Sequence, residues 1–297
     1  MLRSFFLVCL VCASAAFLSA PLTSPALAEP APAPAGEEGQ ALGAAMMARL
    51  AEDLRVDELI AVIRLEGLDY GAQMEEDLLS GKGGSSWQAA VARIYDARAM
   101  RVHFDGAFAR SIGAAEDTVQ DILEFFGTPL GDRILVLEIE ARRSLLDPAV
   151  EEAARARLED MIVEEDPRLD LLQRFAEVNQ LVESNVSGAL NANLALFQGM
   201  AEIGDLTENM TEEQMLADVW AQEPEIRTET EEWLMSYLAL AYGPLSDEEL
   251  GTYIHFCETE AGQKLNSALF AAFDQVFTGI SRNLGRAVAR QMIGEDI

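Results

Sequence analysis

The chain has 297 residues, of which 51 are acidic and 21 basic, and its formal net charge at pH 7 is −30. Such a charge repels the phosphates of nucleic acids and of anionic lipid headgroups, so we expect no nucleic-acid partner. Half of the residues are apolar, which is enough for a sizeable hydrophobic core.

The first 28 residues have the features of a secretory signal peptide. Arg3 supplies a short positive region, an apolar run extends from Phe5 to Leu18, and the segment ends at Ala26-Leu27-Ala28 with small residues at both outer positions. The apolar run is too short to span a bilayer, which takes about 20 residues. We therefore expect cleavage after Ala28 and no transmembrane segment in the mature chain.

The amino-acid composition indicates the cellular compartment of the protein. Two lysines occur against 19 arginines, and alanine is abundant, which suggests a GC-rich bacterial genome. We therefore expect a periplasmic protein of a Gram-negative bacterium. Cleavage would leave 20 basic and 51 acidic residues, a net charge of about −31, and Cys257 as the one cysteine. No intramolecular disulfide would then form, so the core must hold the fold together.

Beyond the signal peptide the spacing of apolar residues is helical. Residues 29–39 are a Pro/Ala-rich segment that we expect to be a disordered linker, because alternating proline prevents helix formation. Apolar residues then recur three and four positions apart, as in Leu59, Val62 and Ile63. Residues 80–86 (S-G-K-G-G-S-S) indicate a flexible loop, and the helical pattern resumes over residues 87–110. No sustained period-two alternation occurs, so the predicted fold class is all-α.

Helix starts are marked at several points. Asp147 is placed to cap a helix that begins with Pro148. Ser246 and Glu249 form a capping-box pattern before Leu250. Residues 205–216 are interpreted as an acidic linker in which a new helix starts at Thr211.

A shift of 131 residues superimposes two similar segments. They share an aromatic residue, a threonine, a glycine and a basic residue, which are Phe125, Thr128, Gly131 and Arg133 in the first copy and Phe256, Thr259, Gly262 and Lys264 in the second. Apolar stripes match on both sides of this pattern. Each copy therefore predicts a helix, a tight corner capped by threonine, and a longer helix. We expect glycine at these two corners because the preceding helix passes too close to leave room for a Cβ atom.

The repeat predicts a helical bundle built from two related helical-hairpin halves, a divergent first half over residues 40–165 and a second half over residues 166–297. The second copy, from Leu245 to Leu265 (L-S-D-E-E-L-G-T-Y-I-H-F-C-E-T-E-A-G-Q-K-L), resembles a bacterial family known as domain of unknown function 2059. The resemblance covers residues 220–285 best. It is weaker over residues 100–150, where Gly127 and Asp132 depart from the pattern. It implies an exported helical domain without an established activity, and so supplies no catalytic residues.

No constellation of catalytic residues is evident. His255 and Glu258 are three positions apart and share a helical face, but a zinc site needs three or four ligands and Cys257 lies on another face. His103 has no nucleophile placed beside it by the sequence. Cys257 corresponds to Phe126 in the first copy, which indicates a buried thiol. Neither a phosphate-binding glycine loop nor a dinucleotide fingerprint occurs. The sequence thus predicts no catalytic, metal or cofactor residue and no cofactor.

Two hypotheses about function follow. We prefer a non-catalytic binding or envelope-support module that takes a partner protein or an apolar ligand in a groove between the halves. The alternative is a hydrolase-like enzyme that uses a carboxylate pair across that groove, which requires a carboxyl with raised proton affinity in a pocket. The sequence does not determine the oligomeric state.

Overall fold

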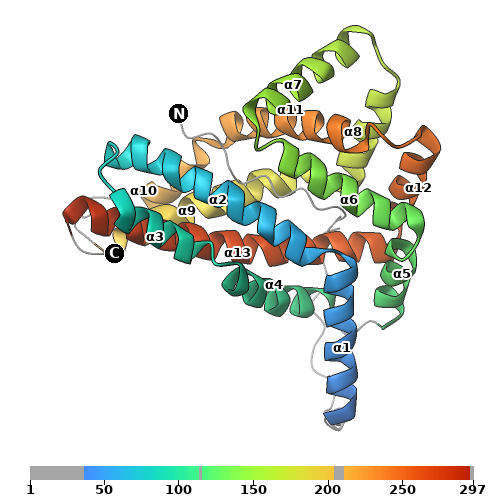
Figure 1. Cartoon of the computed structure of the whole chain (residues 1–297), viewed down its shortest axis with the longest axis horizontal. Coiled ribbons are helices and arrows are strands. Elements are labelled where there is room, and N and C mark those ends of the chain that lie inside the picture. The colour runs from blue at the N-terminus through green and yellow to red at the C-terminus, as the bar shows by residue number, and fades with distance from the viewer. Residues whose placement is uncertain (1–36, 114–115, 204–210, 295–297) are drawn as a thin grey trace, which may run out of the picture.

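The computed structural model describes residues 37–113, 116–203 and 211–294, and within these ranges every regular element is a helix. The predicted all-α class is therefore confirmed. The helices are α1 (Glu37–Asp53), α2 (Val56–Leu79), α3 (Gly84–Ile94), α4 (Ala97–Ile112), α5 (Glu116–Phe126), α6 (Pro129–Ser144), α7 (Pro148–Val163), α8 (Arg168–Val178), α9 (Leu181–Ala201), α10 (Glu212–Trp220), α11 (Glu223–Tyr242), α12 (Asp247–Glu258) and α13 (Glu260–Ile293) (Figure 1).

Some boundaries differ from those that the sequence predicts. The proposed signal peptide and residues 29–36 of the proposed linker lie outside the described residues. Residues 37–39 of that linker are helical, since α1 begins at Glu37, where the alternating prolines have ended. The loop expected over residues 80–86 is shorter, because α3 already starts at Gly84. The helical pattern of residues 87–110 is broken at Asp96, whose carboxylate accepts a hydrogen bond from the Ala99 amide at 2.9 Å and so caps a separate helix, α4.

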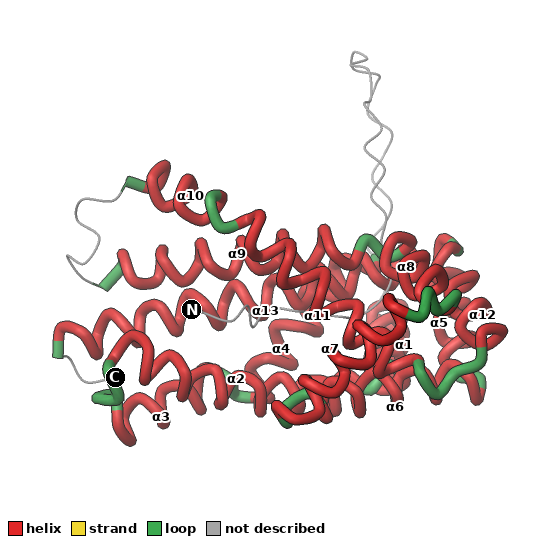
Figure 2. Tube along the Cα trace, turned by 90° about the horizontal axis from the view of Figure 1, so that it is seen from above, coloured by secondary structure: helices red, strands yellow, loops and turns green. Residues whose placement is uncertain are grey.

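The longest helix, α13, is the centre of the bundle. It spans 34 residues and packs along α9 and α4, with further contacts to α3, α5, α2 and α12 (Figure 2). Two glycines let α9 and α13 approach closely. A Cβ atom on Gly199 would lie 2.1 Å from the Arg282 carbonyl oxygen, and one on Gly285 would lie 2.1 Å from the Leu196 carbonyl oxygen. Only glycine fits at either position.

One hydrophobic core extends through the bundle and includes residues from both predicted halves. It reaches from Leu50 at the end of α1 to Val288 near the end of α13. Phe104 on α4 and Phe273 on α13 contact each other inside it, with ring centroids 4.9 Å apart. The two predicted halves are therefore successive parts of the sequence that pack around a single shared core. In the described ranges, no helix combines the length and the hydropathy that a membrane-spanning segment requires.

The two copies of the repeat have the same local geometry. In both, a short helix (α5 or α12) leads through a corner into a longer one (α6 or α13). Thr128 Oγ1 accepts a hydrogen bond from the Gly131 amide at 3.0 Å and donates one to the Phe125 carbonyl at 2.7 Å. Thr259 makes the equivalent bonds to Gly262 and Phe256, at 3.1 and 2.7 Å. Each threonine therefore caps its second helix, as the sequence predicts.

The corner glycines sit where two helices nearly touch. A Cβ atom on Gly131 would lie 2.3 Å from the Phe125 carbonyl oxygen, and one on Gly262 would lie 2.2 Å from the Phe256 carbonyl oxygen. Both positions are backbone contacts, which do not move aside as a flexible side chain does. This is the close approach that the sequence predicts at these glycines.

A candidate ligand pocket between the halves

A pocket of about 320 Å³ lies between α2, α6 and α7 of the first half and α11 of the second. This volume lies within the range of small-molecule sites. Its lining combines charged, aromatic and aliphatic side chains, namely Glu66, Asp69, Gln73, Arg142, Leu145, Leu146, Pro148, Glu151, Arg155, Glu229, Glu232, Trp233 and Ser236. The pocket is thus formed by residues up to 170 positions apart in the chain, from Glu66 to Ser236.

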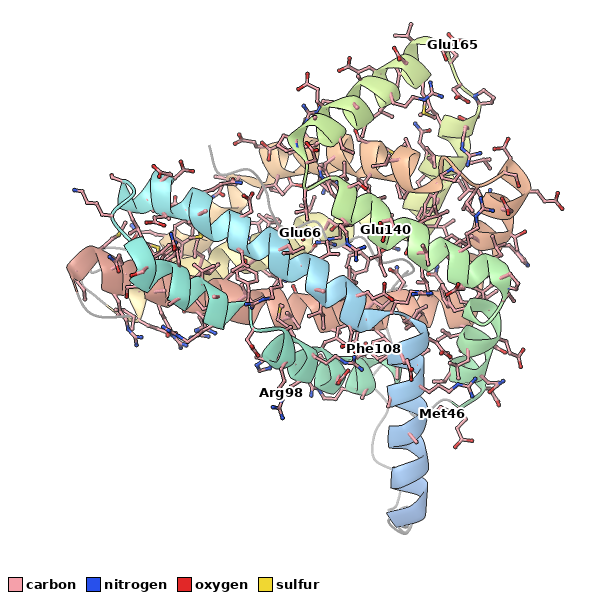
Figure 3. The ribbon with its side chains drawn as sticks, viewed as in Figure 1. Met46, Glu66, Arg98, Phe108, Glu140 and Glu165 are labelled. Carbon is pink, nitrogen blue, oxygen red and sulfur yellow. The ribbon has the colours of Figure 1, made fainter. Side chains whose placement is uncertain are left out.

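A nearly buried ion pair joins two walls of the pocket. Arg142 on α6 donates two hydrogen bonds to Glu66 on α2, from Nε to Oε1 at 2.6 Å and from a terminal nitrogen to Oε2 at 2.7 Å. The Arg142 side chain is 5% exposed and the Glu66 side chain 17%. Glu66 lies on the side of α2 that faces α6 (Figure 3). This bidentate geometry fixes the orientation of both side chains and therefore the spacing of α2 and α6.

The lining is predominantly acidic. Five carboxylates face two arginines across it. Glu66 pairs with Arg142, and Glu151 pairs with Arg155 at 3.1 Å. Asp69, Glu229 and Glu232 also line the pocket, so carboxylates outnumber arginines there by five to two. The pocket therefore has an excess of negative charge.

An aromatic side chain from α11 completes the pocket. Trp233 is half-buried and stacks on Tyr237, with ring centroids 5.2 Å apart and an interplanar angle of 4°. Tyr237 is buried, and its hydroxyl donates to the Glu138 backbone carbonyl at 3.2 Å. The Trp233 indole thus packs on the Tyr237 ring, which is held in place by its hydrogen bond to α6.

A buried carboxyl lies one turn before Arg142 on α6. The side chain of Glu138 accepts hydrogen bonds at Oε1 from the hydroxyls of Tyr242 at 2.7 Å and Tyr253 at 3.0 Å. Burial penalises its charged form and raises the pKa of Glu138 to about 7, although both tyrosine hydrogen bonds act in the opposite direction. Burial also raises the pKa of the Tyr242 hydroxyl, and the nearby Glu138 adds to this rise. Glu138 does not line the pocket.

The repeat shows that these buried polar residues are special to the first copy. The residue 131 positions after Glu138 is Leu269, and the one 131 positions after Arg142 is Phe273; all four are buried. The second copy therefore fills the same places with apolar side chains. Sequence reasoning missed Glu138 and Arg142, although the signal was available: a charged residue aligned with an apolar one on the buried face of a repeated helix.

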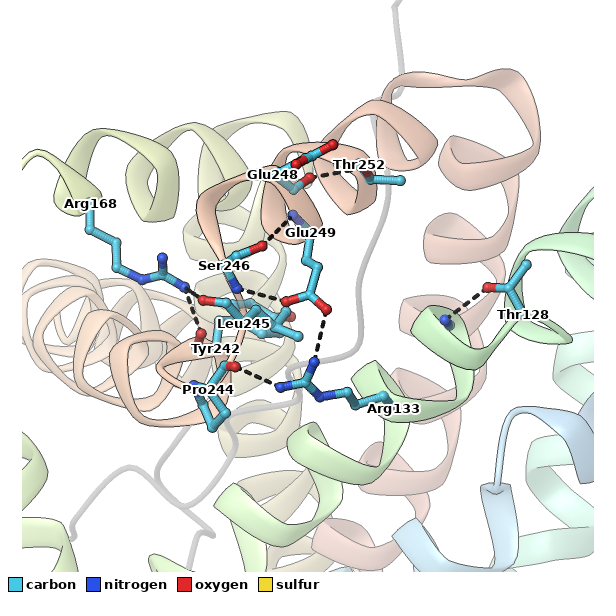
Figure 4. Close-up of polar contacts among 11 residues, drawn as sticks. Thr128, Arg133, Arg168, Tyr242, Pro244, Leu245, Ser246, Glu248, Glu249 and Thr252 are labelled. Carbon is cyan, nitrogen blue, oxygen red and sulfur yellow. Dashed lines mark hydrogen bonds and ion pairs between the residues drawn. The ribbon is translucent and has the colours of Figure 1, made fainter.

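The residues of the repeated corner meet one another. Phe125 and Phe256 stack face to face, with centroids 4.0 Å apart. Arg133 extends from the first copy to the second, where it donates to Glu249 at 2.8 Å and to the Pro244 carbonyl at 2.6 Å (Figure 4). Lys264, its counterpart, is exposed. These corner residues hold the copies together and lie apart from the pocket lining.

Arg133 binds a capping box that itself starts α12. Ser246 Oγ accepts a hydrogen bond from the Glu249 amide at 3.1 Å, and Glu249 Oε2 accepts one from the Ser246 amide at 2.7 Å (Figure 4). Arg168 donates to the carbonyls of Tyr242 and Leu245 in the same turn, both at 2.7 Å. The predicted capping box is therefore confirmed, and two arginines from earlier helices secure the turn before it.

The other residues considered for chemistry are dispersed. His255 lies 3.7 Å from Glu258 on the surface of α12, and Glu258 also pairs with Arg174. Cys257 is fully buried, as its alignment with Phe126 predicts. His103 is exposed on α4. In the part of the chain that the structure describes, no group of three or more potential metal ligands comes together.

In comparisons with known proteins, the chain matches no protein-family model, no curated protein and no solved structure. The resemblance to domain of unknown function 2059 stays a prediction.

Proposed function

We propose that this protein is an exported, non-catalytic binding module of the bacterial envelope, and that the pocket between its halves binds a ligand with a cationic group on an apolar body. The observation that carries the proposal is the composition of the lining, in which five carboxylates face two arginines beside an aromatic ring. The signal-peptide features of residues 1–28 support export to the periplasm.

The charge of the pocket selects the ligand. The excess of carboxylates in the lining, five against two arginines, favours an amine or guanidinium and disfavours an anion. The flat face of Trp233 adds a cation–π attraction, which is strongest for indole among the aromatic side chains. Leu145, Leu146 and Pro148 supply apolar surface for the rest of the ligand. A small organic amine and the basic side chain of a partner protein share this chemistry.

The probe for this chemistry is 2-phenylethylamine, with 2-phenylethanol as its uncharged counterpart. Binding is followed through the indole N–H resonance of Trp233, assigned with the Trp233→Phe variant. We expect the amine to shift this resonance in a saturable manner and the alcohol to bind at least about fivefold more weakly, the effect of roughly 1 kcal/mol of charge attraction.

Two neighbouring glutamates provide a matched pair of variants. Glu232 lines the pocket, whereas Glu231 is exposed on the same helix and does not. Glu232→Gln should weaken amine binding severalfold and Glu231→Gln should leave it unchanged. Equal effects of both variants, or equal binding of amine and alcohol, would overturn the proposed ligand class.

The hydrolase-like alternative is favoured by one observation, that carboxylates from both halves line the same pocket. An acid–base pair needs a carboxyl that holds its proton near neutral pH. Among the described residues, Glu138 is a carboxyl whose pKa burial raises to about 7, and it lies outside the lining. A panel of chromogenic glycosides and esters distinguishes the two. Turnover that disappears in Glu66→Gln or Glu232→Gln, while the protein stays folded, would establish the enzyme and contradict the non-catalytic module.

A further inference from the structure

A second cavity, of about 620 Å³, has the opposite charge. It is a surface groove between α3, α4 and α13, and it shares no residue with the pocket between the halves. Its basic residues are Arg93, His103, Arg282, Arg286 and Arg290. Among the described residues that line it there is no aspartate or glutamate, although the chain carries 51 acidic residues against 21 basic ones.

Three of these arginines form a ladder on α13. Arg282, Arg286 and Arg290 are four residues apart, so their Cα atoms follow one helix face at intervals of about 6 Å. Like charges at this spacing destabilise a helix. Glu202 offsets part of the repulsion, since Arg282 and Arg286 both bind its carboxylate. Within the described ranges, neither Arg290 nor Arg93 on α3 forms an ion pair.

The floor of the groove is apolar. Met100, Val276 and Ile280 are buried and line it, with Ile94 half-buried beside them. Polar groups that donate and accept hydrogen bonds, Gln275 and Asn283, lie on the exposed face of α13 at the same groove. The groove therefore offers guanidinium groups around a surface that also accommodates a short carbon skeleton.

We propose that this groove binds a small organic anion with two or more phosphate or carboxylate groups. The guanidinium fork matches both groups with paired hydrogen bonds, and the ladder spacing suits charges several ångströms apart. The high net negative charge of the protein favours a small anion over a large one. At physiological salt, charges are screened beyond about 8 Å, so a ligand held within the groove senses its arginines, whereas a long polyanion would extend over the acidic surface around it.

The two histidines of the chain make the proposal testable at a single site. His103 lines the groove, and His255 is exposed on α12, which contributes nothing to it. The probe is inorganic triphosphate, added to the full-length mature protein while the imidazole C–H resonances are recorded by NMR. We expect the His103 resonance to shift with saturation and the His255 resonance to stay in place.

The matched variants change the same charge inside and outside the groove. The double variant Arg93→Gln/Arg290→Gln removes two arginines that form no ion pair with any residue that the structure describes. Arg98→Gln removes an arginine that projects from α4 and does not line the groove (Figure 3). Triphosphate affinity measured by calorimetry should fall at least about tenfold in the double variant and less than about twofold in Arg98→Gln. Circular dichroism should show both variants folded, since all three side chains are exposed.

A lipid source of the same phosphate chemistry is distinguished with vesicles of equal parts phosphatidylcholine and phosphatidylglycerol. Binding of triphosphate but not of these vesicles supports the proposal. Binding to the vesicles alone, parallel shifts of both histidines, or equal effects of Arg98→Gln and the double variant would overturn it. None of these outcomes depends on the pocket between the halves, so the two proposals fail independently.

Discussion

Phe125 and Phe256 occupy the same position in the two copies of the repeat, 131 residues apart, and they stack directly on each other. Their ring centroids are 4.0 Å apart and their planes differ by 11°. Tyr253 extends the cluster and lies 5.7 Å from Phe125. The corner motif therefore acts as the interface between copies as well as the start of each long helix.

The stacked pair should be energetically coupled. Phe256→Ala removes a buried ring and should lower the free energy of unfolding by about 3 kcal/mol. Phe125→Ala should cost less, because its side chain is only half-buried. In a double-mutant cycle by urea unfolding we expect a coupling energy of about 1 kcal/mol, the usual worth of an aromatic pair beyond its area. Strict additivity would show that the rings do not stabilise each other.

Glycine is required at the corners for steric reasons. Gly262→Ala would place a Cβ atom 2.2 Å from a carbonyl oxygen and 2.8 Å from the Cys257 Cα atom, so the helices must move apart. We expect a loss of about 2 kcal/mol or more in the free energy of unfolding. Gly251→Ala is the control, since the space beside that helical glycine is open. There the substitution should stabilise by up to about 1 kcal/mol.

The buried Glu138 should make stability depend on pH. The ordinary pKa of a glutamate, 4.5, applies to the unfolded chain, whereas burial raises the pKa of Glu138 to about 7 in the folded protein. The folded state therefore binds more protons in this interval, and the free energy of unfolding falls as the pH rises through it. A difference of this size corresponds to about 3 kcal/mol.

Glu138→Gln isolates this effect from other titrating groups. The amide oxygen keeps an acceptor for Tyr242 and Tyr253 but does not titrate. Relative to this variant, the natural protein should lose about 3 kcal/mol of stability between pH 4.5 and pH 8, as measured by urea unfolding. A constant difference across that range would contradict the buried-carboxyl interpretation. Glu138→Leu, which copies Leu269, should destabilise at every pH because two buried hydroxyls lose their acceptor.

Removing only one partner of the ion pair between Arg142 and Glu66 should lower the free energy of unfolding substantially. Arg142→Met leaves the Glu66 carboxylate in a largely buried position without its counter-charge, and we expect a loss of about 3 kcal/mol. Adding Glu66→Gln removes that charge and should restore much of the stability. A double variant that is less stable than Arg142→Met, by thermal and urea unfolding, would show that the pair contributes more than charge balance.

The local elements of the fold follow from short stretches of the chain. Helical spacing, the caps at Asp147 and Ser246, and the threonine–glycine corners depend on residues within one or two turns of each other, so they can be recognised in the chain. The burial of Cys257 followed from its alignment with Phe126. The helix break at Asp96 was missed because the apolar periodicity is similar on both sides of it, and only the cap separates α3 from α4.

The two candidate sites depend on contacts between residues that are far apart in the chain. Glu66 and Arg142 are 76 residues apart, and Glu138 and Tyr242 are 104 apart. No local sequence pattern predicts these side-chain contacts, because they depend on how the helices pack against one another. Composition predicted an acidic protein, whereas packing brought arginines from α3 and α13 together in one groove and gathered carboxylates in another pocket. Charge in the sequence is a sum, but the field at a site depends on the distances between groups, which only the folded chain fixes.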